Sequence, residues 1–199
     1  LDHFKPTKNI NKADVKRQFG LNENKKTFLF VGRIDGEKRL DVLLQAMKIL
    51  NRDDIQLGIA GIGTELENLK KLAHKLQVED NVRFLGFIPD ESLPILLTCV
   101  DIFAMPSQAE LLSIATLEAM GCEKPLLAAS AGALPELVSS GENGFLFESG
   151  NPSSAAKYMA MLADCPEKWS MMGKMSRQKA MPHNIPNIIQ LYEKAYDSA

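Results

Sequence analysis

The sequence predicts an α/β fold: a Rossmann-like, doubly wound parallel sheet of about six strands with helices on both faces. One observation is a set of short, continuous apolar runs, such as residues 27–32 and 55–60, which are typical of strands covered on both faces. Another is that segments with helical apolar spacing alternate with these runs over about the first 150 residues. A third is that polar or glycine-containing loops follow the strands, at the edge where open sheets of this kind bind ligands.

In the first half of the chain, residues 1–10 are expected to be extended, because Pro6 disfavours a helical conformation at Lys5. A short helix follows and ends at Gly20. Apolar residues at helical spacing and short apolar runs then alternate. The expected helices are 11–19, 40–50, 65–76 and 89–97, and the expected strands are 27–32, 55–60, 82–85 and 101–105.

The second half begins with a stretch that is apolar on nearly every helical face, which predicts a buried helix. A turn at Lys124-Pro125 then leads into a buried strand. The expected helices are 111–120, 134–138, 152–162, 167–179 and 185–196, and the expected strands are 125–129 and 144–147. No internal repeat or linker divides the chain, so we expect a single domain over residues 1–199.

The composition argues against several classes of protein. A hydrophobic content of 45% and a charged content of 24% are ordinary for a globular domain, and a net charge of -2 argues against non-specific nucleic-acid binding. Cys99, Cys122 and Cys165 lack metal-ligand spacing and predict reduced thiols in a cytoplasmic protein. No apolar run is long enough to span a bilayer. Because the sequence does not begin with methionine, we expect a domain excised from a longer protein.

Two carboxylates accompany the expected helix 111–120. Glu110 stands where this helix should begin, and Glu118 lies within it, about 12 Å further along the axis. The free N–H groups of a helix start favour phosphate, so a nucleotide sugar fits between the two carboxylates. The alternative is that Glu110 is a solvated acid at the helix start and that Glu118 pairs with a nearby Lys or Arg.

The loop after the first strand, Gly32 to Arg39, carries Arg33 and Lys38. Arg can bind a diphosphate in bidentate fashion, while Lys supplies a point charge. Alternatively, these charges pair with Asp35 and Glu37 in a solvated loop.

The loops after the next two strands could open space for a ligand. Gly61 and Gly63 do not complete the dinucleotide fingerprint G-x-G-x-x-G, so hydride transfer is disfavoured. Phe87 and the backbone beside it could hold a base, although a packed aromatic side chain explains the residue as well. The sequence has no metal-ligand cluster, no Asp-x-Asp pair, no G-x-S-x-G elbow and no convincing general base.

Taken together, these motifs resemble the C-terminal, donor-binding half of retaining glycosyltransferases of family 4 (glycosyl transferases group 1), whose GT-B architecture has two Rossmann-like domains. The resemblance runs nearly end to end. It includes FVGRIDGEKRLDVLLQAM, IAGIGTELENL, NVRFLGFIPDESLPILL and VDIFAMPS, and its most specific part is the Glu-x7-Glu region, AELLSIATLEAMGCEKPLLAASAGALPELVSSGENGFLF.

The resemblance implies a role for each matching residue. Arg33 and Lys38 would bind the donor diphosphate, Glu118 would accept hydrogen bonds from the ribose, and Glu110 would contact the donor sugar. This makes Glu110, Lys38 and Arg33 the candidate catalytic residues. The N–H groups around Leu112 and Ser113 would face the phosphates, and the Phe87–Ile88 backbone would read the base. The remaining candidate donor-binding residues are Gly32, Gly61, Gly63 and Leu111. No cofactor or metal is implied.

The sequence departs from the family pattern at two places. Many relatives have Glu-Gly-Phe-Gly where this chain has Glu110-Leu111-Leu112-Ser113, which bears on how closely the backbone approaches the sugar. This variant is reminiscent of members that act on lipid acceptors. The loop Gly36-Glu37-Lys38-Arg39 also replaces the usual Glu-Lys-Gly.

The function that follows is transfer of a sugar from a nucleotide diphosphate sugar to a glycan or lipid acceptor, with retention. The expected location is cytoplasmic, with possible peripheral contact at the inner face of the membrane, and the acceptor would bind through an N-terminal domain outside this chain. A fragment of this kind should turn over poorly or not at all. A nucleotide-sugar epimerase of related fold and a non-catalytic nucleotide-sugar-binding module remain as alternatives.

Overall fold

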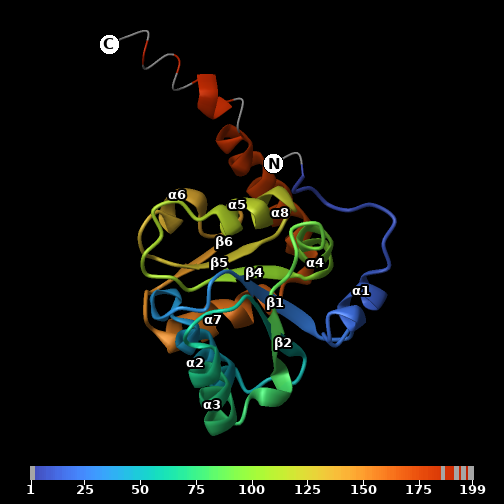
Figure 1. The fold of residues 1–199 in the computed structure, drawn as a ribbon, viewed down its shortest axis with the longest axis vertical. Coiled ribbons are helices and arrows are strands. Elements are labelled where there is room, and N and C mark those ends of the chain that lie inside the picture. The colour runs from blue at the N-terminus through green and yellow to red at the C-terminus, as the bar shows by residue number, and fades with distance from the viewer. Residues whose placement is uncertain (1–2, 185–186, 191–192, 194–195, 197–199) are drawn as a thin grey trace.

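A computed structural model describes residues 3–184, 187–190, 193 and 196. It contains a parallel sheet of six strands in the order β3-β2-β1-β4-β5-β6 (Figure 1). The strands are β1 (Lys26–Val31), β2 (Ile55–Ala60), β3 (Val82–Gly86), β4 (Ile102–Met105), β5 (Leu126–Ala129) and β6 (Gly144–Phe147). The predicted fold class is therefore confirmed.

The chain runs outward from β1 through β2 to β3 and then returns to the other side of β1 with β4. The strand order reverses between β1 and β4, and such a switch point opens a crevice at the carboxyl ends of the strands. The loops that the sequence singled out follow the carboxyl ends of β1, β2, β3 and β4, so they lie at this edge of the sheet.

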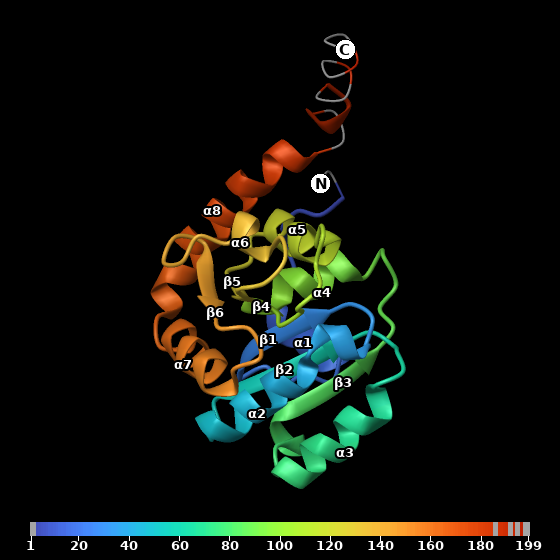
Figure 2. The ribbon, with the colours of Figure 1, turned by 90° about the vertical axis from the view of Figure 1, so that its left-hand side faces the viewer.

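Helices cover both faces of the sheet, as the turned view shows (Figure 2). On one face, α2 packs against α3 and α7, and on the other, α1 packs against α4 and α5 against α8. The helices are α1 (Lys12–Gln18), α2 (Leu40–Leu50), α3 (Leu66–Leu76), α4 (Leu93–Cys99), α5 (Ile114–Gly121), α6 (Leu134–Leu137), α7 (Pro152–Ala163) and α8 (Trp169–Ala180). None of the helices in the described part of the chain has the length and apolar character needed to cross a lipid bilayer.

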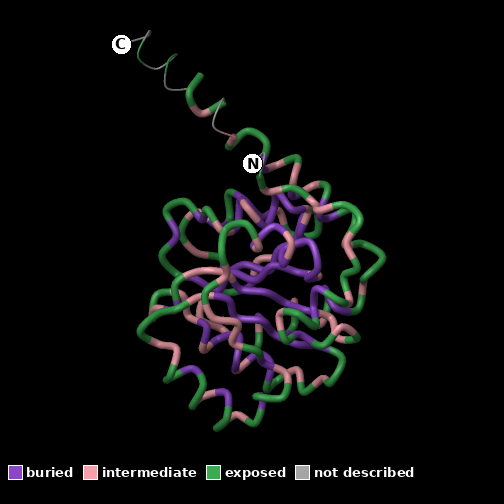
Figure 3. The backbone as a smooth tube through the Cα atoms, turned by 45° about the vertical axis from the view of Figure 1, so that its right-hand side comes forward, coloured by how far each residue is buried: buried purple, intermediate pink, exposed green. Residues whose placement is uncertain are grey.

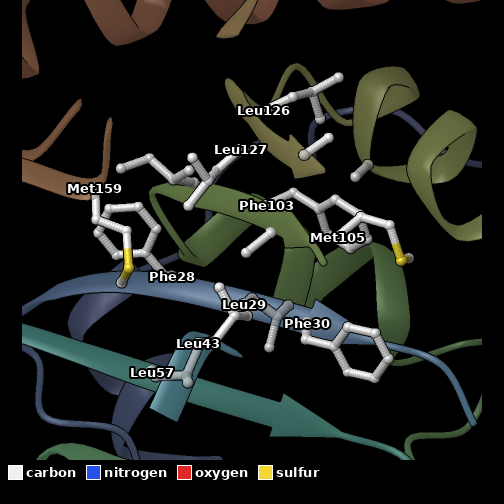
Figure 4. Packing of buried hydrophobic residues seen from close by; sticks show 14 of the residues in the cluster. Phe28, Leu29, Phe30, Leu43, Leu57, Phe103, Met105, Leu126, Leu127 and Met159 are labelled. Atoms are coloured by element: carbon white, nitrogen blue, oxygen red, sulfur yellow. The ribbon is translucent and has the colours of Figure 1, made fainter. Parts of the chain in front are cut away.

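The core lies along the central strands, where the backbone is buried almost continuously (Figure 3). Every residue of β2 is buried, and its one polar side chain, Gln56, donates to the Asn22 carbonyl and to the Thr27 hydroxyl. Side chains from β1, β2, β4 and β5 meet there with Leu43 of α2 and Met159 of α7 (Figure 4). The buried side chains of the two halves of the chain form one hydrophobic cluster.

Two helices begin three or more residues later than the sequence predicted. The helix expected from residue 89 begins at Leu93, because Pro89 to Ser92 form a turn in which the Ser92 amide donates to the Pro89 carbonyl at 2.9 Å. The helix expected from residue 111 begins at Ile114. The last expected helix, 185–196, falls partly outside the described residues, and the described residues 187–190, 193 and 196 are helical.

Candidate functional site

A cavity of about 290 Å³ lies at the carboxyl ends of β1, β2 and β3. Its walls come from the loops after these three strands and from the start of α4. Five of the predicted donor-site residues line it: Gly32, Arg33, Gly61, Phe87 and Ile88. The structure thus brings together residues that are far apart in the sequence, from Gly32 to Ile88.

Two glycines allow the loops after β1 and β2 to lie against each other. A Cβ atom on Gly61 would overlap the carbonyl oxygen of Gly32, and the φ of Gly61 is +143°. A Cβ atom on Gly63 would overlap the backbone of Ile34. Gly61 lines the cavity, whereas Gly63 packs beneath the neighbouring loop and does not line it. The glycines therefore shape the site by close backbone approach.

Arg33 fits both interpretations of its loop. Arg33 lines the cavity, its side chain is 73% exposed, and its guanidinium pairs with Asp35 at 2.8 Å and with Glu37 at 3.2 Å. Exposed pairs of this kind contribute at most about 1 kcal/mol. Arg33 can therefore exchange them for a stronger, bidentate anion such as a diphosphate.

Lys38 and Glu110 form a buried ion pair across 72 residues of sequence, with 2.6 Å between Nζ and Oε1. Their side chains are only 13% and 9% exposed. The surrounding backbone holds the pair, because the Gln108 amide donates to the Glu37 carbonyl at 3.1 Å and the Ala133 amide donates to the Glu110 carbonyl at 2.8 Å. The alternative that Glu110 is a solvated acid is therefore wrong.

The position predicted for Glu110 at a helix start is also wrong. Because α5 begins at Ile114, Glu110, Leu111 and Leu112 belong to the loop after β4, and the spacing of about 12 Å along one axis does not apply. Ser113 is the N-cap residue, with extended φ and ψ angles, and its buried hydroxyl bonds to that of Thr116 at 2.7 Å. Leu111 and Leu112 are 97% and 55% exposed, so they are not part of a buried stripe.

Glu118 lies on α5 and is only partly exposed. The predicted alternative of a Lys or Arg partner is not found, because its carboxylate makes no ion pair with any residue that the structure describes. Burial, and next the charge of Asp90, raise the pKa of Glu118 to about 7, while His3 opposes this shift. Glu118 is thus electrostatically coupled to a residue of the cavity wall, since Asp90 lines the cavity.

The sequence interpretation missed two features of this edge. Asp90 faces the cavity from the turn between β3 and α4, where its place directly after the Phe87–Pro89 loop was the available signal. Ile62, the second missed residue, is 60% exposed beside the cavity. Phe87, which the sequence did single out, is 68% exposed, so the alternative of a packed aromatic side chain is wrong. Within the described residues, no group of three or more His, Cys, Asp or Glu side chains has the geometry of a metal site.

The site combines an apolar-walled cavity, an exposed Arg, a buried Lys–Glu pair and a desolvated carboxylate at one edge of the sheet. Residues 11–179, and so all of these groups, match the family described as glycosyl transferases group 1. The chain belongs to this family.

The similarity to individual members of the glycosyl transferases group 1 is moderate and extensive. The chain is 33% identical over 184 residues to a D-inositol 3-phosphate glycosyltransferase of Streptomyces scabiei, covering 87% of this chain and 41% of that protein. It is 36% identical over 146 residues to an uncharacterised glycosyltransferase of Methanocaldococcus jannaschii, covering 73% of this chain and 37% of that protein. The chain thus spans about two fifths of the length of these relatives.

The fold is also similar to those of solved glycosyltransferase structures. HepE of Anabaena, solved in complex with UDP-glucose, superposes with a TM-score of 0.89 at 25% identity, covering 100% of this chain and 55% of HepE. The C-terminal domain of LpcC, a glycosyl transferase group 1 protein of Francisella tularensis, has a TM-score of 0.80 at 23% identity, covering 92% of this chain and 97% of that domain. At 23% identity, the similarity to the LpcC domain supports the fold alone.

Proposed function

We propose that this chain is the donor-binding domain of a retaining glycosyltransferase of family 4, and that it binds a nucleoside diphosphate sugar at the carboxyl edge of the sheet. The observation that carries the proposal is that the cavity, Arg33 and the Lys38–Glu110 pair lie at the same carboxyl edge of the sheet. The complex of HepE with UDP-glucose supports a nucleotide sugar as the ligand class.

The base and ribose occupy the cavity in this proposal. The backbone at Phe87 and Ile88 reads the base edge, and the exposed Phe87 and Ile62 side chains offer apolar surface to its ring. The Glu118 carboxylate accepts hydrogen bonds from the ribose hydroxyls once it is ionised. Its partial burial makes such bonds stronger than they would be in water.

Two cations bind the diphosphate and stabilise it as the leaving group. Arg33 exchanges its exposed carboxylate partners for phosphate oxygens, while Lys38 supplies a fixed charge because Glu110 and the loop around it hold its ammonium. The first N–H groups of α5, beside Leu112 and Ser113, face the phosphates. We expect no metal requirement, since these groups provide the positive charge.

Glu110 contacts the donor sugar. Its carboxylate is held at 2.6 Å from Lys38 Nζ and retains acceptor capacity for a sugar hydroxyl. Leu111, which is 97% exposed directly after it, stands where many relatives have glycine, and we assign it a part in selecting the sugar.

The whole activity belongs to a longer protein in this proposal. An N-terminal domain binds a glycan or lipid acceptor. The enzyme works in the cytoplasm, and it is in peripheral contact with the membrane when the acceptor is a lipid. The isolated chain is inactive. The length of the relatives, of which the chain spans about two fifths, supports this division.

Calorimetric titration of the chain with UDP, GDP, ADP and their sugars tests the donor site. We expect saturable binding to one base, weakened by about tenfold or more in Lys38→Ala and in Glu118→Ala, because each change removes a charge-assisted contact. The exposed Lys48 on α2 provides the matched control, and Lys48→Ala should bind as the parent does. Absence of binding in both the folded chain and the longer protein would overturn the proposal.

Turnover by the longer protein separates transfer from its alternatives. A nucleotide sugar incubated alone would yield an epimer or a free sugar from an epimerase, whereas a transferase consumes the donor only when an acceptor is present. Excess EDTA tests the metal requirement, and we expect the transferase activity to be retained in it. Loss of activity in EDTA, with recovery when a divalent cation is added back, would contradict that part of the proposal.

A further inference from the structure

A second cavity, of about 350 Å³, lies at the opposite edge of the sheet, where β4 and β5 begin. Its walls come from the segment before α1, the start of α1, the end of α4, the turn after α5 and the start of α8. The charged side chains that line it are Lys12, Asp101, Glu123 and Lys124. A backbone contact keeps this wall compact, because a Cβ atom on Gly173 of α8 would overlap the Glu123 carbonyl.

Lys124 is a buried cation that faces this cavity without a carboxylate partner. The residue is 7% exposed, and its Nζ donates to the carbonyls of Thr98 at 3.2 Å and Val100 at 3.0 Å. No carboxylate of a described residue lies within 4.0 Å of this nitrogen. An ammonium group has three N–H donors, so the two carbonyls leave one donor and the whole charge without a counter-ion. Buried lysines are almost always paired.

The other groups around Lys124 leave the cavity positive. Asp101 is already neutralised, because Lys16 Nζ lies 3.0 Å from its Oδ2. Burial raises the pKa of the Cys122 thiol to about 12 and also raises that of Cys99, so both thiols are neutral. The remaining charges on the cavity wall are the two ammonium groups of Lys12 and Lys124 against the single carboxylate of Glu123.

This environment has a measurable consequence for Lys124. Burial, and next the repulsion by Lys12, lower its pKa to about 8, while Asp101 opposes the shift. A bound anion would offset both causes, because its negative charge would serve as the missing counter-ion of Lys124 and would reduce the repulsion between the two lysines.

We propose that this cavity binds a small oxyanion, a carboxylate- or phosphate-bearing metabolite, between the ammonium groups of Lys124 and Lys12. Thr7 and Ser170 line the same space, and a hydroxyl is a side-chain group that can donate to an anion. The volume is that of a small-molecule site. Because β4 and β5 begin at this edge and the proposed donor site lies where β1, β2 and β3 end, the two ligands bind at opposite edges of the sheet.

The test uses Trp169, which is the only tryptophan of the chain and lines the cavity. Inorganic phosphate and citrate are titrated separately at pH 7 and constant ionic strength, with tryptophan emission and the thermal midpoint as readouts. We expect a saturable change in emission and a rise in the midpoint with at least one of the two anions. Affinity should fall between pH 7 and pH 9 as Lys124 loses its proton.

Variants assign the response to this cavity. Lys12→Gln should weaken the binding by about fivefold or more, and Lys48→Gln, which removes another exposed lysine away from the cavity, should not. Lys124→Met should abolish the response if the variant folds. The proposal is overturned if neither anion gives a saturable response, or if Lys12→Gln and Lys48→Gln alter it equally.

Discussion

Glu110 and Glu118 are eight positions apart in the sequence, but their carboxylates have different electrostatic environments. Glu110 has a buried cation at 2.6 Å, whereas no described residue offers Glu118 an ion pair. A desolvated carboxylate without a partner costs free energy in the folded state. The chain retains it at the edge where ligands bind to open sheets, which is the expected location of groups that serve binding rather than stability.

The cost of Glu118 predicts a pH-dependent stabilisation by Glu118→Gln. The folded chain holds this proton up to a pKa of about 7, but the unfolded carboxyl releases it near its ordinary pKa of 4.5. The unfolded state therefore binds fewer protons between these values, and stability falls as the pH rises through them. We expect Glu118→Gln to raise the free energy of unfolding by about 1–2 kcal/mol at pH 8 and to change it little below pH 4.5, after allowance for partial exposure.

Urea unfolding at both pH values measures this difference, and Glu136→Gln on α6 removes an exposed carboxylate as the control. An equal effect of Glu118→Gln at the two pH values would mean that the carboxyl keeps its ordinary pKa.

At the scale of elements, the loop between β4 and α5 shows where apolar patterning gives the wrong boundary. Leu111 and Leu112 continue the apolar character of the helix in sequence, yet they are exposed and precede its first turn. The helix begins at Ile114 instead, because the Glu110 carbonyl bonds to the Ala133 amide and Glu110 bonds to Lys38, which direct the chain away from a helical path. Periodicity alone carries no information about such contacts.

In the turn after β2, adding a single methyl group to Gly61 should strongly destabilise the fold. In Gly61→Ala the new Cβ atom would overlap the Gly32 carbonyl at a φ of +143°, so β1 and β2 would separate at their carboxyl ends. We expect a loss of about 2–4 kcal/mol in the free energy of unfolding. Gly36→Ala, where a Cβ atom meets nothing within 4 Å, should change it by less than about 0.5 kcal/mol. Similar values for the two variants in urea unfolding would refute the close-approach argument.

At the scale of the whole molecule, the sheet is completed by contacts between segments that are distant in sequence. Lys16 of α1 pairs with Asp101, 85 residues later, and the same carboxylate accepts the Thr27 amide of β1 at 2.8 Å. This carboxylate therefore joins α1, β1 and the start of β4. The pair is mostly buried, with side-chain exposures of 7% and 18%.

Breaking this pair should destabilise the whole domain. Lys16→Met leaves Asp101 desolvated without its counter-ion, and we expect the free energy of unfolding to fall by about 2–4 kcal/mol. Arg17 on the same helix provides the comparison, because it pairs with Asp14 and Glu23 but its own side chain is exposed to solvent. Arg17→Met should cost less than about 1 kcal/mol in thermal or urea unfolding. If both variants change the free energy of unfolding only slightly, the Lys16–Asp101 pair does not stabilise the domain.

The sequence by itself determined the order and type of the strands and helices, from α1 through α8, and it predicts the edge at which a ligand would bind. It could do so because strands covered on both faces and amphipathic helices have local, periodic signatures. Only the tertiary structure decided that Lys38 bonds to Glu110, that α5 begins at Ile114, and that Lys124 faces a cavity without a counter-ion. These features depend on desolvation and on contacts between loops up to 72 residues apart, which no local pattern records.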